Sequence, residues 1–146
     1  MTKSKKKIVK TIPNKIPTKH IVVYDAIFQQ QVDVLMNYTL EKYEKWLNRN
    51  KIKDITLKDY DSFTGWVSDY VDEKGITKRI LFIPKFEWLI KHQGTLIHEI
   101  THVIIKIWAM NNIHFNAETQ EFLAHSIGNM YEDIARKLLQ VKKVKR

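Results

Sequence analysis

The spacing of hydrophobic positions changes character along the chain. Residues 20–24 form a short β-type run, and Asp25 after them is suited to cap a helix. From residue 26 to about residue 48, apolar side chains recur every three or four positions, which predicts an N-terminal helix. Residues 63–71 and 77–83 are two further β-type runs. The turn-forming sequence between them, Asp-Glu-Lys-Gly, predicts a β-hairpin.

The second half of the chain has helical periodicity. One helix is expected to begin near Phe86 or at Thr95 and to end near Asn111, and a last helix, capped by Asn116, to run to about Leu139. The pattern therefore predicts an α+β fold with a β-hairpin or three-stranded sheet, an N-terminal helix, a middle helix and a C-terminal helix. Residues 18–140 are expected to form one domain between a basic disordered arm, 1–17, and a basic tail, 141–146.

Charge is distributed unevenly over the 146 residues. The net charge is +9, but residues 1–19 carry seven lysines and residues 136–146 carry six Lys or Arg, and neither segment contains an acid. The remaining 12 basic residues face all 16 acidic ones, so the body of the chain is acidic by about four charges. This argues against a basic nucleic-acid-binding face on the domain. The ends are expected to make weak, salt-dependent contacts with nucleic acid or anionic surfaces.

Composition narrows the chemistry further. The chain has no cysteine, so it forms no disulfide, and any metal must be bound by imidazole and carboxylate groups. No apolar run is long enough to span a membrane, and no apolar segment of a secretory signal follows the basic start. A cytoplasmic location is expected.

The strongest chemical signal is the sequence His98-Glu99-Ile100-Thr101-His102. Two histidines four residues apart lie on one side of a helix, so both rings can bind one zinc ion. Glu99 is placed to take a proton from water activated by the metal. The surrounding helix is apolar over most of its circumference, and polar groups in a buried helix need partners. The alternative interpretation is a pair of core histidines with a glutamate in an ion pair.

A catalytic zinc site needs a third protein ligand and one open position. Position 108 is a tryptophan, so the longer HExxHxxGxxH pattern is absent. The remaining candidates for the third ligand are His114, Glu118, Glu121 and His125. Glu121 and His125 share one side of the last helix with the small residues of that helix, which would allow a close approach to the motif helix. The main apolar stripe of that helix, however, points away from Glu121.

The motif helix, with a glutamate on the helix after it, resembles the gluzincin branch of the zincin metallopeptidases. More narrowly, residues 63–135 resemble small metallopeptidases encoded in tailed-phage genomes, through the runs at 80–86, 95–102 and 121–128. The resemblance implies a zincin-like fold, Zn²⁺ bound by His98, His102 and Glu121, and Glu99 as the catalytic acid and base. At position 125 the family pattern has tyrosine, so the role of His125 is open between a transition-state donor, a group that supports the ligands and an alternative ligand.

The sequence thus predicts a zinc-dependent hydrolase, a metallopeptidase acting on a protein or peptide substrate, located in the host cytoplasm if the chain is phage-encoded. A strand of the hairpin, residues 77–83, is expected to pair with an extended peptide. Two other functions are compatible with the sequence. One is a metal-binding, non-proteolytic phage structural or assembly protein. The other is a DNA-associated protease similar to the SprT-like family, in which His125 would be the third ligand.

Overall fold

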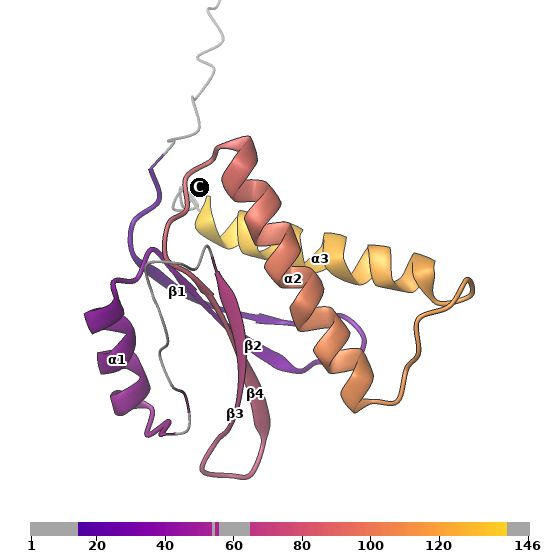
Figure 1. The fold of residues 1–146 in the computed structure, drawn as a ribbon, viewed down its shortest axis with the longest axis horizontal. Coiled ribbons are helices and arrows are strands. Elements are labelled where there is room, and N and C mark those ends of the chain that lie inside the picture. The colour runs from indigo at the N-terminus through magenta and orange to yellow at the C-terminus, as the bar shows by residue number, and fades with distance from the viewer. Residues whose placement is uncertain (1–14, 54, 56–64, 140–146) are drawn as a thin grey trace, which may run out of the picture.

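The computed structural model describes residues 15–53, 55 and 65–139. They form a four-stranded mixed sheet and three helices, which confirms an α+β domain (Figure 1). The elements are β1 (Lys19–Tyr24), β2 (Gln31–Met36), α1 (Leu40–Arg49), β3 (Trp66–Val71), β4 (Thr77–Ile83), α2 (Ile90–Met110) and α3 (Gln120–Leu138). Residues 1–14 and 140–146, which include most of the expected arm and tail, lie outside the described residues. Ile16, within the range expected for the arm, is buried in the core.

The sheet has the strand order β1-β2-β4-β3. β1 and β2 are antiparallel, β2 and β4 are parallel, and β3 and β4 form an antiparallel hairpin. The predicted hairpin is therefore confirmed, although residues 63 and 64 of its first run lie outside the described part. The expectation that residues 77–83 bind a peptide is wrong, because both edges of β4 are already paired.

The long N-terminal helix predicted for residues 26–48 is also wrong. Its first part is the strand β2 and only its second part is helical, as α1. Asp25 does act as a cap, but of a tight turn: its carboxylate accepts hydrogen bonds from the backbone N–H groups of Ile27, Phe28 and Gln30. These bonds direct the chain back along β1. The sheet consequently has four strands where three were expected.

Two hydrophobic clusters occupy the two faces of the sheet. The larger one lies under α2 and α3 and includes Val34, Leu81, Ile100, Ile104 and Met130. The smaller one lies under α1, where Tyr43 packs on Phe82 with ring centroids 4.5 Å apart. Among the described residues, no helix is long and apolar enough to cross a bilayer.

Candidate metal centre

The motif lies in the middle of α2, which begins at Ile90, between the two starts expected from the sequence. Thr95 does not cap the helix; its hydroxyl lies one turn inside and donates to the carbonyl of Lys91. The apolar residues of α2 face the sheet and bury Ile100, Val103 and Ile107 completely. This packing holds the helix in place and leaves His98 and His102 exposed on its outer side.

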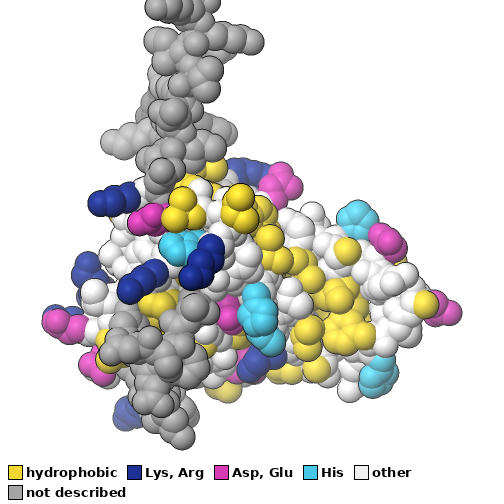
Figure 2. Space-filling model, turned by 45° about the horizontal axis from the view of Figure 1, so that its top comes forward, with side chains coloured by type: hydrophobic (Ala, Val, Ile, Leu, Met, Phe, Trp, Pro, Cys, Tyr) yellow, Lys and Arg dark blue, Asp and Glu magenta, His cyan; other side chains and the backbone are white. Residues whose placement is uncertain are grey.

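The two imidazole rings point at one another. The Nε2 atoms of His98 and His102 are 3.1 Å apart, and the ring centroids are 4.7 Å apart with the planes nearly perpendicular. Two nitrogens bound to one tetrahedral zinc ion, with Zn–N bonds of about 2.0–2.1 Å, are separated by about 3.3 Å. The geometry of the pair therefore fits two ligands of a single ion. Figure 2 shows histidine side chains at the surface, with charged side chains beside them and a hydrophobic area nearby.

Glu99, the neighbour of His98 on the helix, is only 7% exposed, and its Cγ atom lies against Gly65. Burial raises the pKa of its carboxyl group, while the nearby charges of His98 and His102 act to lower that pKa. A buried carboxyl group beside two imidazoles is suited to exchange a proton. Its raised pKa makes the protonated and ionised forms closer in free energy than they are in an exposed acid.

Gly65, the residue before β3, closes the site from the sheet side. A Cβ atom built on it would lie 2.9 Å from Cγ of Glu99 and 2.9 Å from Cδ1 of Ile83. Both distances are below normal contact, so only glycine fits without displacing these side chains. The sequence contains no local signal for this contact, because Gly65 and Glu99 are distant along the chain.

The expected third ligands are not gathered at the histidine pair. Within the described residues, no group of three or more His, Asp or Glu side chains is placed to hold one ion. The four candidates, His114, Glu118, Glu121 and His125, are all exposed at or near the start of α3. The structure thus brings together His98, Glu99 and His102, and leaves Glu121 and His125 apart from them.

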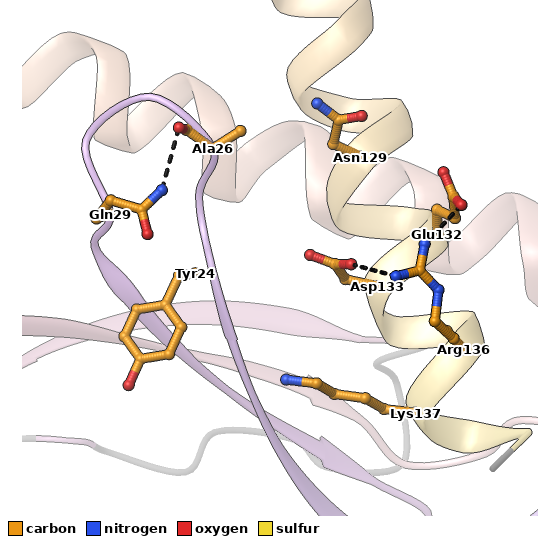
Figure 3. Close-up of a pocket in the computed structure, with 8 residues that line it drawn as sticks. All are labelled: Tyr24, Ala26, Gln29, Asn129, Glu132, Asp133, Arg136 and Lys137. Carbon is orange, nitrogen blue, oxygen red and sulfur yellow. Dashed lines mark hydrogen bonds and ion pairs between the residues drawn. The ribbon is translucent and has the colours of Figure 1, made fainter.

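A polar hollow of about 450 Å³ lies elsewhere, between the β1–β2 turn and the second half of α3 (Figure 3). Its cations already have partners: Arg136 pairs with Glu132 and Asp133, and the Nζ atom of Lys137 donates to the carbonyl of Val22. We therefore interpret this hollow as part of the attachment of α3 to the sheet.

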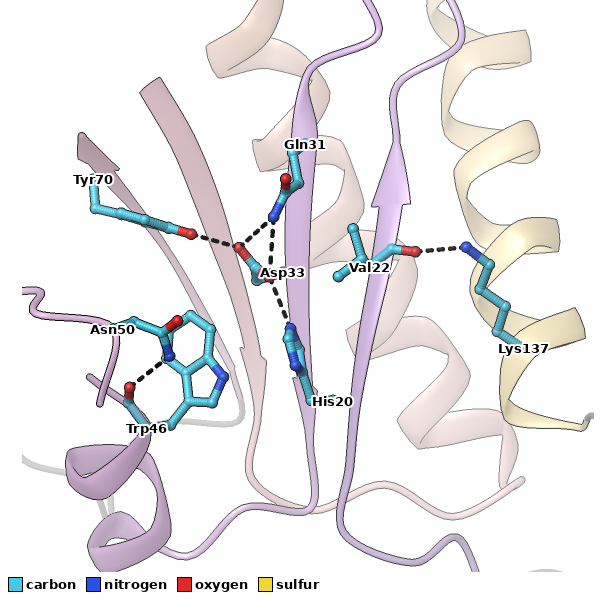
Figure 4. A network of polar contacts seen from close by, with 8 residues as sticks. All are labelled: His20, Val22, Gln31, Asp33, Trp46, Asn50, Tyr70 and Lys137. Carbon is cyan, nitrogen blue, oxygen red and sulfur yellow. Dashed lines mark hydrogen bonds and ion pairs between the residues drawn. The ribbon is translucent and has the colours of Figure 1, made fainter. Parts of the chain in front are cut away.

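A second polar cluster, which sequence analysis did not predict, lies on the α1 side of the sheet (Figure 4). The Asp33 carboxylate is almost fully buried and is bound by three side chains: His20 at 2.8 Å, the Tyr70 hydroxyl at 2.7 Å and the Gln31 amide at 3.2 Å. These contacts join β1, β2 and β3. They satisfy a buried charge that would otherwise be costly.

Comparison with known proteins gave no match to a family model, to a curated protein or to a solved structure. Interpretation of the site therefore depends on its own geometry.

Proposed function

We propose that the chain is a zinc-dependent hydrolase, a metallopeptidase whose metal ligands are His98, His102 and Glu121. The observation that carries this proposal is the 3.1 Å separation of the two Nε2 atoms, with the buried carboxyl group of Glu99 on the same helix. At this distance the two rings share an N–H···N hydrogen bond, and an ion bound between the same two nitrogens would take the place of that bond.

The roles of the residues follow from their chemistry. Zinc in such a site supplies Lewis acidity and makes water a nucleophile at neutral pH. The Glu99 carboxylate accepts a proton from the attacking water and then passes it to the leaving amine, so that water and a peptide bond give an acid and an amine. His125, on α3, is proposed as a donor to the developing oxyanion.

The edge of the sheet offers a position at which a peptide substrate could bind. β3 is an edge strand in the described part of the sheet, and its first residues follow Gly65, which contacts Glu99. An extended peptide that paired with β3 would pass close to the Glu99 carboxyl group. This supports a peptide as the substrate, with β3 taking the role that sequence analysis gave to β4.

Metal content tests the proposal. We expect about one zinc per chain in native protein purified from zinc-supplemented cells, measured by elemental analysis. His98→Ala and Glu121→Ala should lower that content, because each removes a ligand. Glu99→Gln should keep the zinc and lose peptidase activity, since the amide cannot accept the proton. Native protein without stoichiometric metal, or an active Glu99→Gln variant, would rule the proposal out.

A further inference from the structure

One end of the molecule brings the first described residues together with the start of α2. The side-chain amide of Asn37 donates to the carbonyls of Ile16 and Phe86, 2.7 Å and 3.0 Å away. Beside these bonds, Lys15 forms an isolated β-bridge with Glu87. These contacts hold the beginning of the described chain against the loop that leads into α2.

The end of α3 is held at the same end of the molecule. The Nζ atom of Lys19, at the start of β1, donates to the carbonyl of Lys137, 2.7 Å away. Figure 1 shows the first described residues, the start of α2 and the end of α3 together at this end. Residues 1–14 contain five lysines, residues 140–146 contain four Lys or Arg, and neither segment contains an acid. Two strongly basic segments therefore join the described chain at one end.

Two large apolar side chains are exposed at this same end. Leu89 is 44% exposed, and Ile90, the first residue of α2, is 90% exposed. We call these two residues the apolar tip. The helix does not require them, because Leu89 occupies the N-cap position, where polar side chains that bond the first backbone N–H groups are preferred, and it makes no such bond. The core does not require them either, so the apolar tip is suited to an apolar environment outside the molecule.

Exposed lysines surround the apolar tip. Lys85 and Lys91 flank it along the chain, and Lys15 lies across the β-bridge from Glu87. Among the residues that the structure describes, none of these three lysines takes part in an ion pair. Glu87 is the only acid in the sequence from residue 84 to residue 98. In Figure 2, hydrophobic side chains lie near the top of the molecule with Lys or Arg side chains beside them.

An apolar tip with basic surroundings matches the surface of an anionic bilayer. Apolar side chains enter the boundary between headgroups and acyl chains, while cations stay with the charged headgroups. The two attractions add, and one alone gives only weak, reversible binding. A nucleic acid also offers phosphates to lysine, but aliphatic side chains find an apolar layer there only where base steps are unstacked. The combination therefore favours a lipid surface.

We propose that this end of the molecule docks on an anionic lipid surface. The apolar tip enters below the headgroups, and the three exposed lysines and the basic segments 1–14 and 140–146 face the negative charges. The inference goes beyond the proposed hydrolase and does not depend on a metal ion. His98 lies eight residues after Ile90 on α2, about 12 Å along the helix axis, so docking would hold the candidate metal centre near the lipid surface.

Co-sedimentation of the full chain with lipid vesicles tests the proposal. The native protein should bind phosphatidylcholine vesicles that contain about 30% phosphatidylserine, and should not bind vesicles of phosphatidylcholine alone. Ile90→Gln should weaken that binding by about fivefold or more, because the transfer of an apolar side chain out of water is lost. The matched control is Ile76→Gln, at a 54% exposed isoleucine in the β3–β4 turn at the opposite end of the molecule, and it should bind as the native protein does (Figure 1).

The electrostatic part has its own pair of variants. Lys91→Gln removes a positive charge beside the apolar tip and should weaken binding to the phosphatidylserine vesicles by about threefold or more. Lys74→Gln removes the same charge from an exposed lysine in the β3–β4 turn and should leave binding unchanged.

A fluorescent label shows which end of the molecule enters the lipid. The chain has no cysteine, so Leu89→Cys creates a unique site for a polarity-sensitive fluorophore. Its emission should shift to the blue when phosphatidylserine vesicles are added, because the label moves out of water. The same label on Ile76→Cys should show no shift.

Each outcome supports or overturns the docking surface. Because Ile90 is almost fully exposed, Ile90→Gln should fold, and a thermal melt checks this. Native vesicle binding by Ile90→Gln, or equal spectral shifts at the two labelled positions, would overturn the proposal. A native protein that binds a DNA duplex but not the phosphatidylserine vesicles would also overturn it and make nucleic acid the partner of this end. Zinc content is measured separately, so failure of the docking surface and failure of the proposed hydrolase are distinguishable.

Discussion

Glu99 and Gly65 meet at the junction between α2 and the sheet. The absent side chain of Gly65 leaves the space that Cγ of Glu99 occupies, and the backbone oxygen of Phe82 is only 3.1 Å from the same point. The side chains could adjust to an added methyl group, but the backbone oxygen has little freedom to move. A single carbon atom at this position is therefore enough to shift the carboxyl group of Glu99.

We predict that Gly65→Ala lowers the free energy of unfolding by about 1–3 kcal/mol, as overpacking of a filled site does. It should also lower peptidase activity more than zinc content, because it moves Glu99 and leaves the outward-facing histidines in place. Urea denaturation, elemental analysis and a peptide-cleavage assay measure the three effects.

The control for this prediction is Gly94→Ala, at a helix position in α2 with nothing within 4 Å of the added atom. Because alanine is the better helix former, we expect this variant to be more stable by up to about 1 kcal/mol. If Gly65→Ala were as stable and as active as the native protein, the tight contact with Glu99 would be disproved.

At the scale of single residues, the sequence predicted the features that depend on residues close together along the chain. The spacing of His98 and His102 predicted two rings on one side of a helix, and this is confirmed. The role of Gly65 could not be predicted, because it arises from a contact between distant segments. The relation of Glu121 to the pair depends on how two helices cross, which the spacing of residues within one helix does not determine.

Among the secondary-structure elements, β2 shows why the first predicted helix was wrong. Val32, Leu35 and Met36 have helix-like spacing, but every residue from 32 to 36 is buried, because β2 lies inside the sheet with a hydrophobic cluster on each face. A strand buried on both faces does not alternate between apolar and polar residues, and in β2 only the buried Asp33 interrupts the apolar run of residues 32–36. Such a run cannot be distinguished from a buried helix by its periodicity.

The Asp33 cluster connects three strands, and Tyr70 spans the greatest distance, from the edge strand β3 over β4 to β2. Tyr70→Phe removes the hydrogen bond and leaves part of a buried carboxylate unsatisfied. We predict a loss of about 1.5–3 kcal/mol in the free energy of unfolding, typical of a hydrogen bond to a charged group. Tyr24→Phe, at a half-exposed tyrosine, is the control and should change stability little.

The same bond predicts a pH dependence. Burial, and then the hydrogen bond to Asp33, raise the pKa of Tyr70 in the folded state well above its ordinary value. The stabilisation is therefore complete below about pH 10, where the unfolded tyrosine is protonated, and is lost as the pH rises above it. Between pH 9 and 11 the native protein should lose more stability than Tyr70→Phe. Parallel losses in the two proteins would contradict this.

Over the whole molecule, the two ends are basic and the rest of the chain is close to neutral. The described residues carry 15 Lys or Arg and 13 Asp or Glu, which is close to neutral. Removing residues 1–14 and 140–146 leaves 16 basic residues against 16 acidic ones in the rest of the chain. Any attraction to a polyanion therefore depends on the two ends.

We predict that the full chain binds a labelled DNA duplex weakly at about 50 mM salt and that most of this binding is lost at about 200 mM, because phosphate contacts release counterions. The chain without residues 1–14 and 140–146 should not bind at either concentration, as measured by fluorescence anisotropy. Ile16 is retained in this variant because it belongs to the core. Equal binding by both proteins would locate the contact on the domain, and would contradict both this prediction and the DNA-associated alternative that the basic ends suggest.

The parallel pairing of β2 with β4 has a consequence for synthesis of the protein. β2 is complete at Met36, but its partner is complete only at Ile83, after α1 and β3 have been made. Until then, a hydrophobic strand with one unpaired edge is present on the nascent chain. A ribosome that stalls between these two points would release a fragment prone to aggregate, so expression at lower temperature, or with chaperones that hold exposed strands, should raise the yield of folded protein.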